Sequence, residues 1–202
     1  MKKEILFVLL NEFADWEGAF IAPMLNGGIE PNRAKYVVKT LSVTKEPVTS
    51  IGGFCVLPNY DIHSIPDDYE GLILIGGMAW FSPEAELIVP LVQQAIEKNK
   101  LVAGICNGSV FLAKHGFLNE VMHTSNTLKY LKEFAGEKYT GEGKYINQQA
   151  VRDERIVTAN GSAYLEFCRE ILYALDADIP EKIEESYQFF KEGLIDRFKD
   201  MI

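Results

Sequence analysis

The chain has 202 residues, of which 48% are hydrophobic and 24% are charged, a composition typical of one globular domain. A chain of this length buries roughly 70% of its unfolded surface, so it needs neither disulfides nor a structural metal to hold a core. Its net charge of -9 repels nucleic acid and anionic membranes, and no run reaches the ~18 apolar residues of a membrane span. We therefore expect no nucleic-acid or membrane partner.

The expected strands are short apolar runs. The first follows a basic start, as in a signal peptide, but its apolar part is only Ile5 to Leu10 and no small-residue cleavage site follows. It is therefore interpreted as a buried strand. Several runs lack polar alternation, which indicates burial on both faces and a mostly parallel sheet. The runs span residues 4–10, 36–43, 71–77, 101–105 and 155–161.

Helical segments alternate with these strands. Asp15 is a candidate N-cap for the first helix, and Gly27 and Gly28 are its stop signal. Pro90 is expected to kink or shorten the second helix. Alternating strands and helices predict a three-layer α/β/α sandwich. The expected helices span residues 15–28, 83–99, 107–116 and 162–175.

Two segments have the pattern of β-hairpins, and the last segment has that of an amphipathic helix. The hairpins are expected at 48–62 and 144–159. The last helix, within 176–202, is expected to pack with one apolar stripe against a single domain formed by 1–175. The stripe consists of Ile183, Tyr187, Phe190, Leu194 and Phe198.

One cysteine stands at a strand-to-helix joint between two glycines, in the pattern Gly104-x-Cys106-x-Gly108. This is the pattern of a nucleophile elbow, a tight turn that tolerates only small residues two positions either side of the nucleophile. The N-terminus of the following helix favours a thiolate, which predicts a lowered pKa for this thiol. The alternative is a small buried hydrophobic residue, as most free cysteines are.

Glu17 and two backbone N–H groups complete the candidate site. Glu17 lies in the first turn of the helix after the first strand, at the same expected sheet edge as Cys106. It serves either as a proton carrier beside the sulfur or only as a partner of the helix dipole. The N–H groups of Asn107 and Gly77 are expected to form an oxyanion hole.

The segments "FADWEGAF", "LILIGGMAW" and "GICNGSVFLA" resemble the ThiJ/PfpI family of the class I glutamine amidotransferase-like superfamily, in the expected order. The resemblance runs from about residue 3 to residue 175. It implies a flavodoxin-like sandwich, commonly a dimer, with no metal or organic cofactor. It also implies that Cys106 is the elbow cysteine, that Glu17 is its acidic partner, and that Gly77 and Asn107 form the anion pocket.

The chain departs from that family at two positions. Members described as peptidases or amidases often have histidine directly after the cysteine, where this chain has Asn107, and this argues against a peptidase. Other members offer a histidine from the segment after the elbow helix. In this chain the third member of the site is therefore either His123 or Asn126.

Two classes of function remain open. In the first, the resemblance implies a cysteine-dependent hydrolase or lyase in which Cys106 attacks a small carbonyl or amide compound, with glyoxalase-, deglycase- or amidase-like chemistry. In the second, the protein is a redox or stress-response protein whose cysteine is oxidised to sulfenic or sulfinic acid. A scaffold with a vestigial site is a third alternative.

Cellular context and assembly are also predicted. The chain has three cysteines, an odd number, and they lie far apart without CxxC spacing: Cys55, Cys106 and Cys168. This pattern favours free thiols in a reducing cytoplasm. A homodimer is expected from the resemblance and from three aromatic residues interpreted as needing cover. These residues are Phe20, Trp80 and Phe81.

Overall fold

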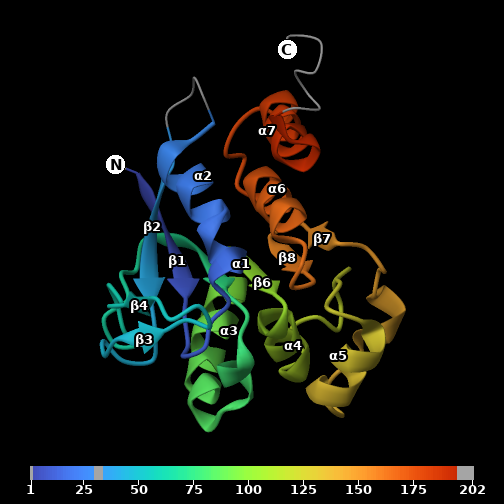
Figure 1. Cartoon of the computed structure of the whole chain (residues 1–202). Coiled ribbons are helices and arrows are strands. Elements are labelled where there is room, and N and C mark those ends of the chain that lie inside the picture. Colours follow the sequence, from blue (N-terminus) through green and yellow to red (C-terminus); the bar gives the residue numbers. More distant parts are fainter. Residues whose placement is uncertain (1, 30–33, 195–202) are drawn as a thin grey trace.

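The computed structural model describes residues 2–29 and 34–194. Within them, the main sheet has the strand order β2-β1-β5-β6-β8-β7, and its neighbours are parallel except for β7 with β8 (Figure 1). The strand order reverses direction between β1 and β5, which is where ligands bind in folds of this kind. The strands are β1 (Lys3–Val8), β2 (Tyr36–Leu41), β5 (Tyr69–Leu74), β6 (Leu101–Ile105), β7 (Ala150–Asp153) and β8 (Ile156–Ala159).

Helices cover both faces of the sheet, so the predicted flavodoxin-like three-layer sandwich is confirmed (Figure 1). One face carries α1 (Asp15–Ala19), α2 (Ile21–Gly27) and α6 (Tyr164–Ala174), with α7 (Pro180–Glu192) packed against α6. The opposite face carries α3 (Val89–Glu97), α4 (Asn107–Lys114) and α5 (Leu128–Ala135).

The central strands are buried on both faces, as the unbroken apolar runs predict. In β1, Ile5 and Phe7 belong to the cluster under α2 and α6, whereas Leu6 and Val8 belong to the cluster under α3 and α4. Successive side chains of a strand point to opposite faces, so a strand covered by helices on both sides must be apolar throughout.

The first predicted helix, 15–28, is two helices. α1 ends at Ala19 and α2 begins at Ile21, because Pro23 has no N–H to donate to the carbonyl of Ala19 four residues earlier. Gly28, with φ of 78°, ends α2 as predicted.

Asp15 is not the N-cap that the sequence suggested. The N-cap of α1 is Ala14, and Asp15 is the first helical residue. The Oδ2 of Asp15 instead accepts a hydrogen bond from the N–H of Gly52 at 2.8 Å. The carboxylate therefore ties α1 to the neighbouring hairpin.

The second predicted helix, 83–99, begins as a 3₁₀ helix, η2 (Pro83–Ile88), and continues as α3. Pro90 stands in the first turn of α3, where its missing N–H has no helical partner to lose. It thus shortens the α-helix, in agreement with the prediction.

α5 was not predicted, and neither were the 3₁₀ helices η1 (Met78–Phe81) and η3 (Gly141–Lys144). The sequence holds a start signal for α5. Thr127 caps it by accepting a hydrogen bond from the N–H of Tyr130 at 3.1 Å.

Both predicted hairpins are present. The first pairs β3 (Val48–Thr49) with β4 (Cys55–Val56) through a turn in which Gly53 has φ of 87°. The second pairs β7 with β8 in antiparallel register. The second hairpin closes one edge of the main sheet, and the first forms a separate two-stranded sheet.

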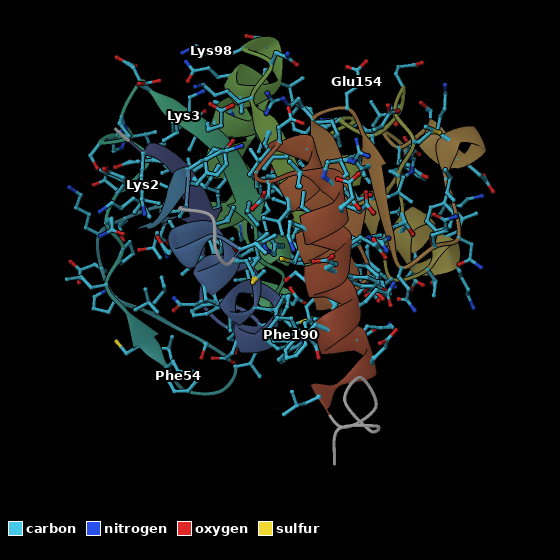
Figure 2. The ribbon with its side chains drawn as sticks, turned by 90° about the horizontal axis from the view of Figure 1, so that it is seen from above. Lys2, Lys3, Phe54, Lys98, Glu154 and Phe190 are labelled. Carbon is cyan, nitrogen blue, oxygen red and sulfur yellow. The ribbon has the colours of Figure 1, made fainter. Side chains whose placement is uncertain are left out.

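The C-terminal helix α7 packs with only part of the predicted stripe. Ile183 is buried. Phe190, labelled in Figure 2, is half-exposed, and its ring packs edge to face on that of Phe20 with centroids 4.8 Å apart. Leu194 is exposed, because α7 ends at Glu192 and Gly193, with φ of 79°, breaks the helical spacing. Phe198 lies outside the described residues.

Of the three aromatic residues expected to need cover, Trp80 is buried, and Phe20 and Phe81 are partly buried against aromatic rings of the same chain. Trp80 is buried, and its Nε1 donates to the carbonyl of Ile75 at 2.6 Å. Phe20 packs on α6 and α7, and Phe81 packs on Phe134 at 5.1 Å between ring centroids. These side chains therefore give no support to a dimer.

No helix in the described part of the chain has both the length and the apolar character that crossing a membrane requires.

Candidate functional site

The candidate site lies at the carboxyl edge of the sheet. β1, β5 and β6 end level with one another in the pairing register. The segments that leave them bring together the residues predicted from the sequence. These residues are Glu17 after β1, Gly77 after β5, and Cys106 with Asn107 after β6.

The turn at Cys106 has the geometry of a nucleophile elbow. The backbone of Cys106 has φ of 54° and ψ of -123°, a conformation that residues other than glycine rarely adopt. A Cβ at Gly104 would lie 2.9 Å from the backbone of Gly108, and one at Gly108 would lie 2.5 Å from the carbonyl oxygen of Leu74. The flanking glycines are therefore a steric requirement of the turn, as the sequence pattern predicts.

Glu17 is fully buried beside the sulfur. Its Oε2 accepts a hydrogen bond from the N–H of Gly76 at 2.7 Å. Its Oε1 is buried without a hydrogen-bond partner among the described residues. A Cβ at Gly161 would lie 3.0 Å from Cys106 Sγ and 3.1 Å from Glu17 Oε1, so the missing side chain of Gly161 leaves room for both atoms.

Burial shifts the pKa of both groups. It raises the pKa of Glu17 to about 7, against the lowering effect of the Gly76 N–H. It also raises the pKa of the Cys106 thiol, and the charge of Glu17 raises it further. The N–H groups of Asn126 and Asn107 lower the pKa of the thiol but do not outweigh burial. The N-terminus of α4 thus acts in the predicted direction, through the Asn107 N–H, but the predicted lowering of the thiol pKa is wrong, because burial and the charge of Glu17 outweigh it.

Asn126, and not His123, contacts the sulfur. The Nδ2 of Asn126 donates to Cys106 Sγ at 3.5 Å, and its Oδ1 accepts from the N–H of Gly161 at 2.9 Å. The two hydrogen bonds fix the orientation of the amide. Of the two candidates for the third member of the site, the one beside the sulfur is therefore an amide and not an imidazole.

His123 is a buried structural residue. Its Nε2 bonds the hydroxyl of Tyr139 at 2.7 Å, and its Nδ1 bonds the carbonyl of Val121 at 2.8 Å. Burial lowers its pKa. Both ring nitrogens are occupied, so His123 has no free nitrogen to offer Cys106.

The side chain of Asn107 links the loop after β5 to α5 beside the sulfur. Its Nδ2 donates to the carbonyl oxygen of Gly77 at 3.1 Å, and its Oδ1 accepts from the hydroxyl of Tyr130 at 3.1 Å. Sequence reasoning missed Tyr130 because it missed α5, although the Thr127 cap marks where that helix begins. Gly161 and Trp16, whose Nε1 donates to the carbonyl of Gly161 at 2.9 Å, were also missed.

The other two cysteines lie apart from this arrangement. Cys55 is exposed on the first hairpin, and Cys168 is buried on α6, where burial raises the pKa of its thiol. All three cysteines are free. Among the described residues, no group of three or more His, Cys, Asp or Glu side chains is placed to hold a metal ion.

The chain is similar to known proteins over nearly its whole length. The sequence profile of the DJ-1/PfpI family matches residues 3–174. The Bacillus subtilis protein called uncharacterized protease YdeA is 39% identical over 192 residues, which cover 95% of this chain and 92% of that protein.

Two solved structures share the fold and much of the sequence. A DJ-1 superfamily protein from Agrobacterium tumefaciens is 35% identical with a TM-score of 0.83, covering 93% of this chain and 97% of that one. A thiJ/pfpI family protein from Bacillus anthracis is 30% identical with a TM-score of 0.89, covering 98% of this chain and 95% of that one.

Proposed function

The chain belongs to the DJ-1/PfpI family, and from this premise we propose that it is a cysteine-dependent enzyme acting on a small carbonyl or amide compound. Cys106 Sγ is the nucleophile, and Glu17 is the general acid and base. The N–H groups of Asn107 and Gly77 stabilise the oxyanion, and Asn126 orients the sulfur. The reaction class is glyoxalase-, deglycase- or amidase-like.

The observation that carries the proposal is the unpartnered oxygen of Glu17. Oε2 is anchored by Gly76, which leaves Oε1 buried beside the sulfur and free to accept a proton. A carboxyl with a pKa of about 7 exchanges protons readily at neutral pH, which suits a general acid and base. A residue that only balanced a helix dipole would need neither full burial nor this position.

The proposed chemistry starts from the thiol. As Sγ forms a bond to the carbonyl carbon, the thiol proton passes to Glu17, and the carbonyl π electrons move to the oxygen. With an amide, the returning electron pair expels the amine, which takes the proton back from Glu17. The remaining thioester is hydrolysed by water.

With a 2-oxoaldehyde, the same attack, followed by return of the proton from Glu17 to the oxyanion, gives a thiohemiacetal. The hemiaminal adduct of such an aldehyde must first expel its amine, which regenerates the aldehyde. Glu17 then moves the proton of that carbon to the neighbouring carbonyl carbon, and the product is the thioester of a 2-hydroxy acid. Water releases the acid and restores the thiol. This route consumes one water and needs no oxidant.

A peptidase of the cysteine–histidine type is not supported, although two Bacillus subtilis relatives carry the word protease in their names. The residue after the cysteine is Asn107, and both ring nitrogens of His123 are bonded elsewhere. His115 caps the far end of α4, and His63 is exposed. Among the residues that the structure describes, no histidine is placed to accept the proton of Cys106.

The rival hypothesis of a redox or stress-response protein requires a sulfur that ionises readily at rest. The pKa of the Cys106 thiol is raised, which opposes a resting thiolate, whereas the enzyme needs the thiolate only as Glu17 takes the thiol proton during attack. Mass spectrometry after mild peroxide treatment separates the two: the enzyme should keep Cys106 largely reduced, whereas a sensor should accumulate sulfenic or sulfinic acid.

Turnover on methylglyoxal and on small primary amides tests the function directly. The wild type and Cys55→Ser are expected to be equally active, and Cys106→Ser is expected to lose at least about 10³-fold. Equal activity of Cys106→Ser and wild type would refute the nucleophile. Loss of activity in Cys55→Ser would identify Cys55, on the first hairpin, as the nucleophile instead.

We also propose that the protein is a cytoplasmic homodimer. The first hairpin exposes apolar side chains at its tip, and Figure 2 shows Phe54 at the outer edge of the molecule. Free thiols on all three cysteines fit a reducing compartment. Light scattering should give twice the 22.7 kDa chain mass, and Phe54→Glu should reduce it toward one chain. A single-chain mass for the wild type would contradict the dimer.

A further inference from the structure

The side chain of Asn107 is hydrogen-bonded at both ends. Its amide NH₂ donates to the carbonyl of Gly77, and its carbonyl oxygen accepts from the hydroxyl of Tyr130, each at 3.1 Å. A carbonyl oxygen can only accept and an amide NH₂ can only donate, so these two partners fix which way the amide points. Asn107 is itself buried.

The bond from the Asn107 amide to Gly77 joins the two residues of the proposed oxyanion hole, Asn107 itself and Gly77. Asn107 supplies one N–H from its own backbone, and Gly77 supplies the other. Gly77 is near-extended, with φ of 151° and ψ of 170°, so its N–H and C=O point to the same side. The C=O of Gly77 accepts from the Asn107 side chain, so the N–H of Gly77 is directed to the same side, toward the Cys106 turn.

Tyr130 is held in place independently of Asn107. It stands in the first turn of α5, where its N–H donates to the Thr127 hydroxyl. Its ring lies against that of Phe134 with centroids 4.5 Å apart. Burial and the nearby charge of Cys106 raise the pKa of its phenol, so it remains a neutral donor at neutral pH. Tyr130 is therefore a fixed point against which Asn107 is oriented.

We propose that Tyr130 is a positioning residue of the active site, whose hydroxyl holds Asn107 and through it sets the spacing of the two N–H groups of the oxyanion hole. The inference rests on the proposed function for its effect on turnover. It also explains why this chain has asparagine after the cysteine. A side chain with one donor and one acceptor can bond both Gly77 and Tyr130. The Asn107 side chain thus has a structural role and transfers no proton.

The kinetic test compares Tyr130→Phe, which removes only the hydroxyl, with Asn107→Ala, which removes the link but keeps the backbone N–H. Tyr130→Phe should lower kcat about tenfold with little change in KM, because the oxyanion hole acts on the transition state. The double variant should be no slower than Asn107→Ala alone. Tyr173→Phe is the matched control, since its hydroxyl bonds Glu184 on α7, away from the site, and it should match the wild type.

Alkylation of Cys106 by iodoacetamide provides a readout without turnover. The backbone N–H of Asn107 lowers the pKa of the thiol, so loosening it in Tyr130→Phe should move the midpoint of the alkylation curve to higher pH. If Cys106→Ser keeps full turnover, the proposed function fails while this shift still tests Tyr130. A Tyr130→Phe variant with wild-type kcat and a wild-type alkylation curve would overturn the inference, and so would additive losses in the double variant. Equal melting temperatures of all variants exclude a folding defect.

Discussion

The two sides of the Cys106 sulfur act on it in opposite directions. On the α1 side lies the carboxyl of Glu17, whose charge raises the pKa of the thiol. On the other side lie the N–H groups of Asn126 and Asn107, which lower it. Burial raises the pKa of the thiol further, because it disfavours the charged thiolate. The acidic side therefore prevails, and the thiol keeps its proton at rest.

It follows from this balance that the sulfur is a thiol, and not a thiolate, in the resting site. Glu17 and Cys106 form a buried pair that holds at most one negative charge, and with the pKa of Glu17 at about 7 the charge goes first to the carboxyl. The nucleophile is formed when substrate arrives and the proton crosses to Glu17. The amide side then stabilises the charge that develops.

The largest expected effect comes from removing the acidic side. Glu17→Gln keeps an oxygen for the Gly76 N–H but cannot carry a proton, so kcat/KM should fall by about 10²-fold or more. Alkylation of Cys106 above pH 7 should become faster instead, because the like charge is gone. Opposite changes in turnover and alkylation are the signature of a proton carrier.

Glu97→Gln is the control for that variant. Glu97 is an exposed glutamate on α3, and its loss should change neither rate. If Glu17→Gln slowed both turnover and alkylation, its carboxyl would be assisting the thiolate at rest, and the division of roles between the two sides would be wrong.

The next effect is on stability. An acid whose pKa rises from 4.5 to about 7 on folding stabilises the protein below pH 4.5 and loses that contribution as the pH rises through 7. At about 1.4 kcal/mol for each pKa unit, the wild type should lose up to about 3 kcal/mol relative to Glu17→Gln between pH 4.5 and pH 8.5.

Urea unfolding of both proteins at several pH values measures this difference. Groups common to both proteins, such as the buried His123, cancel in the comparison. A constant gap between wild type and Glu17→Gln over this pH range would mean that Glu17 ionises equally in the folded and unfolded chain.

Much of the fold could be predicted because the signals are local. The unbroken apolar runs identify the central strands, and Pro90 marks the start of α3. The split of the first helix at Pro23 had an equally local cause that was not used. The end of α7 was missed because the apolar spacing continues to Leu194 in the sequence, while Gly193 ends the helix.

The site was predictable only where its residues follow strand ends. Glu17, Gly77 and Cys106 each follow a strand whose position the sequence reveals. Whether Asn126 or His123 contacts the sulfur depends on the path of a loop, for which no spacing rule exists. The raised pKa of Cys106 depends on burial by distant segments and on Glu17, which outweigh the lowering effect of the local helix N-terminus.

A smaller effect is expected from weakening the amide side. Asn126→Ala removes the N–H donated to Sγ, so the pKa of the thiol should rise, and alkylation of Cys106 at pH 8 should slow by about three- to tenfold. Asn126→Asp should slow it more, since it adds a negative charge. Asn119→Ala, which removes an amide with two backbone partners elsewhere, should leave the rate unchanged. Faster alkylation in Asn126→Ala would show that the amide is no donor.

The smallest effect concerns the residue that joins the two sides. Trp16 lies on α1 next to Glu17, and its Nε1 holds the carbonyl of Gly161, whose N–H in turn holds Asn126. Trp16→Phe removes a hydrogen bond of about 0.5–1.5 kcal/mol at a half-exposed position where water can replace it. Alkylation of Cys106 should therefore slow by less than about threefold.

The path of this effect can be tested in the same assay. If Trp16 acts through Gly161 and Asn126, Trp16→Phe should have no further effect in an Asn126→Ala background, because the last link to the sulfur is already gone. An undiminished effect in that background would mean that Trp16 acts on Cys106 from the α1 side, through the packing of Glu17. The two sides of the sulfur would then be coupled through the acid and not through the amide.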